Sequence, residues 1–457
     1  MKELLKISFF DKFVLVTLVL LMFVLSINGT MALRNFLAVV LLFSLLYRTI
    51  KQQINLRGIL KDKQFKLIFT SLLMFVIYVL LHSIFISHEP SWSLPEFRAQ
   101  LIYPLLYLFM GILLVLNFDY DDKSSNKLIL STVFFAMFAH VVYIDIAALY
   151  TFLTEGVMLR RYGGLMDTPV GANYVTNIIL AVLMAEIIYR LRTGKGILTV
   201  SNKVLYGLLG LTVIATLIET IRLGDITLVF LGFVSGIVFL HKNTKYSLLS
   251  KTLIVVTMFA TLTLPLIYNI QTDPRWIKLT ETIPVAINTS SSNMHWRDPS
   301  LFSAPKVKSG SLAGNSNYMR IAWARQSAHY IRKNPLGIGF GRDAFGHTIE
   351  QYHPLRRDMK GYRGMHSHSG IIDLALGVGI PGVLLWSFFG YTVSRKSLQE
   401  IKKSFNYYGI LSLFLIMGFY GRSFFDSNMR DHMFLQFMLL LGVVLAYMFR
   451  NKGCNNA

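Results

Sequence analysis

The stretch FVLVTLVLLMFVLSI, residues 13–27, carries no charge and has only one threonine and one serine among apolar side chains. Comparable apolar blocks recur along the chain, for example at 65–87, 100–118, 127–152 and 430–449. A helix needs roughly 20 mostly apolar residues to cross a bilayer. Because one soluble core would not require so many blocks of this length, the sequence predicts an all-α polytopic membrane protein.

The composition agrees with that class. The chain has 457 residues, of which 54% are hydrophobic and 15% charged, whereas an ordinary soluble domain is about 25% charged. The first block has no small-residue cleavage site after it, so we expect it to be retained as a span. Twelve spans are predicted, at 13–29, 31–48, 65–87, 100–118, 127–152, 170–191, 204–220, 225–241, 252–270, 370–394, 406–424 and 430–449.

The distribution of Lys and Arg predicts the orientation of these spans. With the N-terminus in the cytoplasm, the inner connections and ends carry 24 Lys and Arg, and the short outer connections carry six. Cytoplasmic loops are the ones that accumulate positive charge, so both chain ends are expected inside. Much of the net charge of +21 then reflects topology, and no soluble basic domain remains to bind nucleic acid. The single Cys454 excludes intramolecular disulfides and thiolate metal clusters.

One long segment interrupts the pattern and divides the chain into three parts. Residues 1–270 hold spans one to nine, residues 271–369 form an outer loop domain, and residues 370–457 hold spans ten to twelve. The loop domain carries 14 Lys and Arg against six Asp and Glu, and six of the eleven histidines. Loops this long are usually functional, and a basic, histidine-bearing cap suggests an anionic ligand.

The loop domain is expected to contain a helix. In YMRIAWARQSAHYIRK, 318–333, apolar residues recur at helical spacing. Asn315 or Asn317 is a plausible N-cap, and Asn334 before a proline should end the helix. Gly337, Gly339 and Gly341 follow and predict a tight turn.

Two histidines stand where the tenth span begins, in GMHSHSGIIDLALGVGIPGVLLW, 364–386. A helix should start at about Gly370, with His368 in the capping turn. A neutral imidazole there is a suitable general base, and Asp373 is placed to orient it or to pair with an arginine. The alternatives are an interfacial histidine with only structural contacts, or a metal pair, which lacks the Cys or carboxylates to complete it. The glycines and proline further on predict close helix packing or a kink.

Arginines recur at the outer ends of the spans. A guanidinium grips phosphate oxygens through two parallel hydrogen bonds, so several converging there would suit a lipid diphosphate. The alternative is that arginines at helix ends simply reach lipid headgroups. Arg222 and Arg320 fit that alternative least, because one lies in a very short turn and the other on the loop helix. The other outer arginines are Arg160, Arg161, Arg422 and Arg430.

Five stretches, in this order, resemble the O-antigen ligase and O-antigen polymerase superfamily of bacterial inner-membrane glycosyltransferases. They are RRYGGLMDTPVGANY (160–174), ETIRLGD (219–225), NSNYMRIAWARQSAHYIRKNPLGIGFG (315–341), HSHSGIIDLALGVGIPGVLLW (366–386) and RSFFDSNMR (422–430). With the twelve spans and the large loop, the resemblance covers most of the chain. One departure is Ser369, where the family usually has Asn.

The resemblance implies a reaction and its residues. A polysaccharide would move from undecaprenyl diphosphate to lipid A–core oligosaccharide at the periplasmic face of the inner membrane, with inversion and without cofactor or metal. His368 would be the catalytic base, with His366 the looser match, and Arg222 and Arg320 would stabilise the departing diphosphate. Further candidate substrate-binding residues are His366, Arg160, Arg161, Arg325, Asp373 and Arg430.

Three other functions stay open. A polymerase, which joins lipid-linked repeat units, shares the fold and the chemistry, and a protein O-oligosaccharyltransferase is a more distant relative. The His-x-His pair, the paired arginines and the basic loop, which would suit a phosphorylated core, favour the ligase. A transporter would need charged residues along its spans. The predicted spans are nearly free of them, with Asp145, Glu186 and Glu219 as the exceptions.

Overall fold

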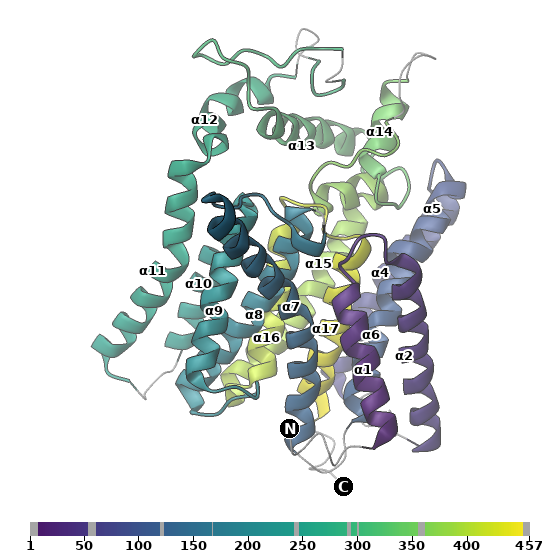
Figure 1. The fold of residues 1–457 in the computed structure, drawn as a ribbon. Coiled ribbons are helices and arrows are strands. Elements are labelled where there is room, and N and C mark those ends of the chain that lie inside the picture. Colours follow the sequence, from purple (N-terminus) through teal and green to yellow (C-terminus); the bar gives the residue numbers. More distant parts are fainter. Residues whose placement is uncertain are drawn as a thin grey trace.

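The structure is a computed structural model that describes residues 8–53, 61–118, 123–166, 168–241, 246–289, 294–298, 301–354 and 362–450. Cys454 lies outside these ranges. Within them the chain is all-helical and forms no strand (Figure 1). This confirms the predicted all-α class.

Most of the described helices form one bundle, and the others lie mainly in a cap over one end of it (Figure 1). The bundle helices are α1 (Phe9–Val24), α2 (Met31–Lys51), α4 (Lys63–Phe85), α6 (Tyr103–Asn117), α7 (Lys123–Glu155), α8 (Pro169–Thr193), α9 (Asn202–Glu219), α10 (Arg222–Leu240), α11 (Leu248–Thr272), α15 (Gly370–Ser404), α16 (Tyr407–Ser423) and α17 (Asp431–Arg450). A short helix, α5 (Pro90–Phe97), runs through a π-helical turn, η2 (Arg98–Ile102), into α6, and η3 (Gly164–Met166) precedes α8.

Ten helices in the described ranges are long and apolar enough to cross a membrane. They confirm a multi-pass membrane protein, and they correspond to ten of the twelve predicted spans. The other two predicted spans coincide with α1 and α16, which have 16 and 17 residues and are shorter than those ten. Several predicted ends were wrong. The fourth span begins at Pro90 because α5, η2 and α6 are continuous, and α15 extends to Ser404.

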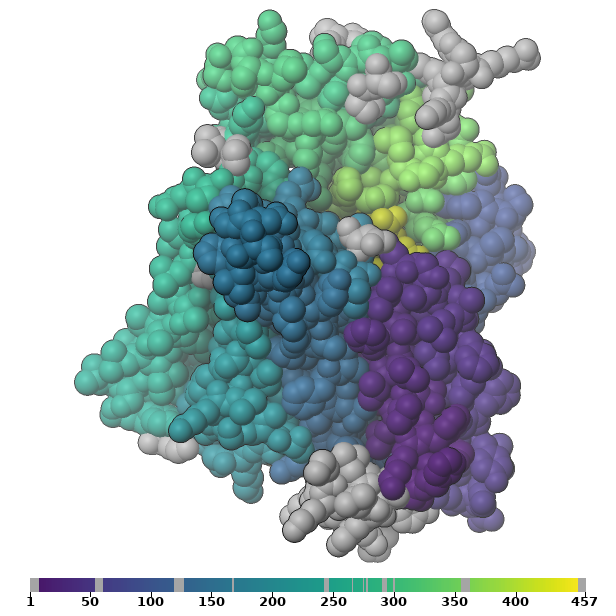
Figure 2. All heavy atoms as spheres, in the orientation of Figure 1, coloured from purple at the N-terminus to yellow at the C-terminus, as the bar shows by residue number. Residues whose placement is uncertain are grey.

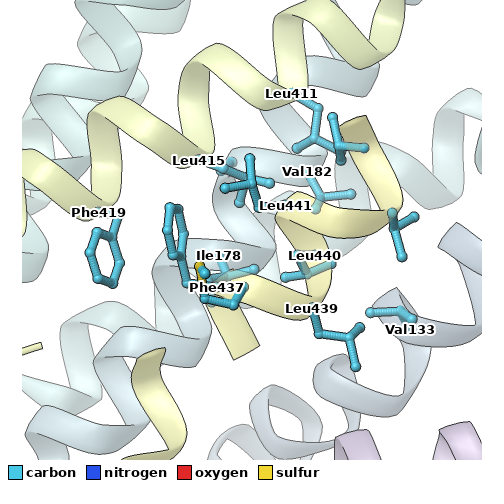
Figure 3. Close-up of a cluster of buried hydrophobic side chains, with 14 of the residues drawn as sticks. Val133, Ile178, Val182, Leu411, Leu415, Phe419, Phe437, Leu439, Leu440 and Leu441 are labelled. Atoms are coloured by element: carbon cyan, nitrogen blue, oxygen red, sulfur yellow. The ribbon is translucent and has the colours of Figure 1, made fainter. Parts of the chain in front are cut away.

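The bundle is built around α17, which is buried along most of its length. A Cβ on Gly111 of α6 would lie 2.2 Å from the Leu439 carbonyl oxygen, and one on Gly442 of α17 would lie 2.1 Å from the Leu108 carbonyl oxygen. The two glycines therefore allow the backbones of α6 and α17 to touch, as small residues do in membrane bundles. Figure 3 shows the adjoining apolar contacts, made by Val133, Ile178, Val182, Leu411, Leu415, Phe419, Phe437, Leu439, Leu440 and Leu441.

Helix α15 is broken inside its first half. Gly379 has a φ of 71° and Pro381 follows it, so the kink expected from the glycines and the proline is confirmed. The turn at 335–339 satisfies the freed backbone groups. Ile338 and Gly339 donate to the Leu376 and Gly377 carbonyls, and Ile380 donates to the Pro335 carbonyl. The break thus joins α15 to the cap.

The cap contains α12 (Pro274–Ile287), α13 (Asn315–Lys333) and α14 (Ala344–Tyr352). It has its own apolar cluster, in which Trp296, Tyr318, Trp323, Tyr330 and Phe345 are buried. Helix α13 lies across the bundle instead of along it (Figure 1), and it ends before Asn334 as expected. The prediction for its start was wrong, because Gly314 is the N-cap residue and makes no side-chain capping bond.

The cap lies at the opposite end of the bundle from the first residues of α1 (Figures 1 and 2) and from the last residues of α17 (Figure 1). Both described ends of the chain are therefore on one face, and the cap is on the other.

Candidate active site

First-turn residues of four helices line one pocket below the cap. Val170 at the start of α8, Arg222 of α10, Arg275 of α12 and Ser316 of α13 all line it. The first N–H groups of a helix lack intrahelical partners and carry partial positive charge. Several such ends around one space favour an anion.

Five arginines line the same space, which we call the arginine pocket. Its empty volume is about 510 Å³. Arg275 pairs with Asp273 at 2.7 Å and Arg422 pairs with Asp426 at 2.8 Å. The lining residues are Arg161, Val170, Ile221, Arg222, Leu223, Arg275, Ser316, Arg320, Arg422 and Asp426. In the described part of the chain, Arg161, Arg222 and Arg320 have no carboxylate partner, so the pocket has excess positive charge.

The two arginines expected from the sequence to act together do share this pocket. Arg222 donates to the side chain of Asn317 and lies 5.8 Å from the centre of the Trp276 ring. Asn317, expected as a cap, instead fixes this guanidinium and donates to the Arg275 carbonyl at 2.8 Å.

Arg320 extends from α13 toward the bundle. It donates to the Phe425 carbonyl at 2.8 Å, and its buried Nε–H has no acceptor among the described residues. Burial, together with the charges of Arg422 and Arg275, lowers the pKa of its guanidinium. An anion in the pocket would therefore relieve both the missing hydrogen bond and the repulsion.

A buried chain of polar groups holds Arg422 in place. Its guanidinium contacts Asp426, the side-chain oxygen of Asn173 at 3.0 Å and the Val170 carbonyl at 3.1 Å. Asn173 in turn donates to Glu219 at 2.8 Å. Glu219, counted from the sequence among the charges within spans, thus supports the pocket from below.

The histidine pair lies in the segment before α15. Ser369 is the N-cap residue, and its side chain accepts from the Ile372 N–H. This confirms the expected helix start at Gly370. His368 has a φ of 59°, which is uncommon for a residue with a side chain. That left-handed turn brings the two imidazole rings to 4.3 Å between centroids.

His366 is held on both sides of its ring. The Arg430 guanidinium lies 3.2 Å from Nε2 of the ring. The Nδ1 of His366 accepts a hydrogen bond from the His368 N–H at 3.3 Å and also lies 3.2 Å from Ser427 Oγ. Ser427 donates to Asp373 at 2.8 Å, and Asp373 also accepts from the Ser367 N–H. Asp373 thus orients His366 through Ser427 and makes no hydrogen bond to His368.

His368 is free by comparison. Its ring stacks on Trp323 at 5.5 Å between centroids, and no described residue hydrogen-bonds to it. Burial, followed by the positive charge of Arg320, lowers the pKa of this imidazole to about 4. Burial and the charge of Arg430 lower the pKa of His366 to about 3. Both rings are therefore neutral near pH 7.

A second pocket is lined by the later residues of the α16–α17 connection. Asp426 of this connection faces the arginine pocket, whereas Ser427, Met429 and Arg430 line the second one. It has an empty volume of about 490 Å³, and its wall is mostly apolar. The other lining residues are Phe75, Gln100, Leu101, Phe340, Gly341, Arg342, Gly370, Asp373, Leu374 and Phe434. We call it the apolar pocket.

The remaining candidates are dispersed. Arg161 lines the arginine pocket, but Arg160 donates to the Tyr268 hydroxyl at 3.0 Å outside it. Arg325 is exposed on α13 and lines neither pocket. Within the described ranges, no three His, Cys, Asp or Glu side chains are grouped as metal ligands.

Arg275 and Asp426 were overlooked in the sequence, and Arg422 was named only as one of several outer arginines. Arg275 follows a predicted span and a proline. An arginine that only contacts lipid headgroups would have the same sequence context, so the sequence does not identify Arg275 as a site residue. Asp426 shares a quoted motif with Arg422 at a spacing of four residues, which is the spacing of a helical ion pair.

The fold and the site define a multi-pass helical membrane protein with a cationic pocket beside a neutral histidine pair. Residues 207–387 match the family model described as O-Antigen ligase, so this part of the chain is similar to that family. That range is less than half of the chain. It runs from α9 to α15 and includes Arg222, Arg275, Arg320 and both histidines. No curated protein matched the chain.

Proposed function

We propose that this protein is an O-antigen ligase of the bacterial inner membrane. It moves a polysaccharide from undecaprenyl diphosphate to lipid A–core oligosaccharide, with inversion at the anomeric carbon and without a metal. Both chain ends are cytoplasmic and the cap faces the periplasm, as the 24 inner against six short-loop outer Lys and Arg favour.

The observation that carries the proposal is the arginine pocket. Five guanidiniums and four helix N-termini surround one space, and three of those arginines have no described carboxylate partner. A diphosphate with two or more negative charges matches this surplus, and fixed charges aimed at a leaving group can supply several kcal/mol of transition-state stabilisation.

The reaction is a single displacement. An acceptor sugar hydroxyl attacks the anomeric carbon of the donor from the face opposite the diphosphate. The new C–O bond forms as the bond from that carbon to the diphosphate oxygen breaks. His368 takes the hydroxyl proton, and Arg222, Arg275 and Arg320 stabilise the charge on the departing undecaprenyl diphosphate.

His368 is better suited to the proton transfer than His366. The His366 Nε2 is occupied by Arg430, whereas the His368 ring has no described hydrogen-bond partner. With the pocket empty, Arg320 opposes a charge on His368. A bound diphosphate would neutralise Arg320, so donor binding itself makes His368 a stronger base.

Transfer between purified lipids tests the proposal. The protein, in nanodiscs with a chelator, is given polysaccharide-linked undecaprenyl diphosphate and lipid A–core, and the product is followed by gel mobility. We expect transfer, and a loss of about 10²-fold or more in kcat for His368→Ala. His366→Ala should lose less.

Full activity of folded His368→Ala would remove the assigned base. A strict metal requirement would remove the metal-independent mechanism. The polymerase alternative is separated by the acceptor, because it predicts elongation of lipid-linked repeat units and no product on lipid A–core.

A further inference from the structure

A third pocket, which we call the α5–α14 pocket, lies on the cap side of the bundle and is not part of the site described above. Its empty volume is about 800 Å³. Unlike the apolar pocket, it is lined almost entirely by polar side chains. The described residues around it are His88, Glu89, Trp92, Ile338, His347, Glu350, Gln351 and Arg363.

The polar groups of this pocket are planar and held in pairs. Arg363 donates to Glu350 at 2.7 Å and lies 3.3 Å from Glu89. The ring of His88 lies 3.2 Å from the Gln351 side-chain oxygen. Carboxylates, amides and imidazoles in such pairs can each exchange hydrogen bonds with neighbouring hydroxyl groups on a sugar ring.

His347 supplies the independent sign that a ligand is missing. It is 6% exposed, and its ring stacks on Trp92 with 3.8 Å between centroids. Its Nδ1 lies 3.5 Å from Glu89 Oε1 and makes no hydrogen bond among the described residues. A buried nitrogen without a partner is costly, and a hydroxyl group in the pocket would satisfy it.

The α5–α14 pocket and the histidine pair lie on two sides of α14. Phe345, two residues before His347, packs on Trp323 at 5.3 Å, and Trp323 stacks on His368. The Gly346 N–H also donates to the Met365 carbonyl. A helix is roughly 10 Å across and Trp323 lies beyond it, so several sugar residues would be needed to reach from the pocket to His368.

The position also indicates which substrate reaches the pocket. Trp92 belongs to α5, which continues through η2, where Gln100 and Leu101 line the apolar pocket. In the loop between the two pockets, Ile338 lines the α5–α14 pocket and Arg342 lines the apolar pocket. The α5–α14 pocket is therefore on the side of the apolar pocket, across the α16–α17 connection from the arginines.

We propose that the α5–α14 pocket binds sugar residues of the acceptor glycan, a proposal that rests on the proposed function. With two carboxylates and one arginine, it suits neutral or amine-bearing sugars and disfavours phosphorylated ones. Held there, the glycan would present its reactive hydroxyl toward His368.

Steady-state transfer with two surface variants tests this role. Gln351→Ala and Glu350→Gln should each raise the acceptor KM roughly three- to tenfold, because each removes hydrogen bonds to the sugar. The donor KM and kcat should stay unchanged. Glu281→Gln, on α12 of the same cap, is the matched control and should change none of these values.

Saturation-transfer NMR gives a readout that does not depend on transfer. The probe is the lipid-free oligosaccharide released from lipid A–core by mild acid, added to the protein in nanodiscs. We expect signals from its neutral sugars with wild type and weaker signals with both variants. Unchanged acceptor KM and unchanged signals in both variants would overturn the pocket assignment. Binding that the variants weaken, without any transfer by wild type, would instead overturn the ligase function and keep the saccharide site.

Discussion

At the residue scale, the two imidazoles of the His-x-His pair are chemically identical but differ in the hydrogen-bond partners of their ring nitrogens. Their rings are 4.3 Å apart. Arg430 and Ser427 take both nitrogens of His366, while Trp323 stacks on His368 and leaves its nitrogens free. A base must have a free nitrogen to accept a proton, so the difference in hydrogen bonding decides between the two.

The low pKa of His368 predicts its chemical reactivity. With a pKa of about 4, about 90% of this ring is neutral at pH 5, against about 3% for an ordinary histidine. Diethyl pyrocarbonate attacks only the neutral form, so the intrinsic rate at His368 should change little between pH 7 and pH 5. Peptide mass spectrometry measures it, with N-acetylhistidine amide as reference.

The variant Arg320→Gln tests whether the charge of Arg320 contributes to the low pKa of His368. Removing the positive charge should raise the pKa of His368, so the rate should begin to fall at a higher pH than in wild type. A wild-type rate that falls in parallel with the reference compound would contradict the low pKa.

Arg275 is predicted to bind the donor, although its sequence context does not single it out. Arg275→Gln should raise the donor KM roughly 10-fold or more, because a charge-assisted hydrogen bond to phosphate is lost. The acceptor KM should stay the same. Arg332→Gln, exposed on α13, is the control, and equal donor KM values for both variants would remove Arg275 from the pocket's function.

The candidate site could be predicted in part from such residues. Arg222 and Arg320 were recognisable because a charge in a short turn or on a loop helix is hard to explain by headgroup contact. Their convergence with Arg275 could not be predicted, because it depends on how α10, α12 and α13 pack against one another. The occupancy of His366 was equally hidden, since Arg430 lies 64 residues away along the chain.

At the element scale, the break in α15 couples a span to the cap. A Cβ on Gly379 would lie 2.3 Å from the Pro335 carbonyl oxygen, and the φ of 71° disfavours any side chain. The 335–339 turn and the start of α15 are therefore fixed against each other, and this sets where the histidine pair stands relative to α13.

Gly379→Ala should destabilise the protein by about 2 kcal/mol or more, through the positive φ and the clash. Gly418→Ala is the matched control, because no atom lies within 4 Å of the added Cβ in α16. Thermal unfolding in detergent compares the two. An equal Tm for both variants would show that the 335–339 turn can move away.

The elements themselves were largely predictable, and their ends were not. Apolar length identified the spans because the bilayer demands it. It could not show that α5, η2 and α6 are continuous, since Pro90 and Pro95 normally mark a helix start or a break. The N-cap prediction for Asn317 was wrong for a different reason. In the folded protein its side chain accepts a hydrogen bond from Arg222 and is not available to cap α13.

At the scale of the whole molecule, the cap and the chain ends lie on opposite faces, and charge predicts which face is which. In a Cys454→Ala background, Ser311→Cys in the cap should react with a membrane-impermeant maleimide on intact spheroplasts. Lys195→Cys, between α8 and α9, should react only after permeabilisation. The reverse pattern would invert the proposed orientation.

The arginine pocket and the apolar pocket contact successive residues of the α16–α17 connection, with Asp426 lining the first and Ser427 the second. If each lipid has its own opening, neither substrate must leave before the other enters. Initial-rate plots against donor at several acceptor concentrations should then intersect, as for a ternary complex, and either lipid should be able to arrive first. An enzyme of this kind would keep its polysaccharide donor bound until a less abundant acceptor lipid reaches it by diffusion in the leaflet.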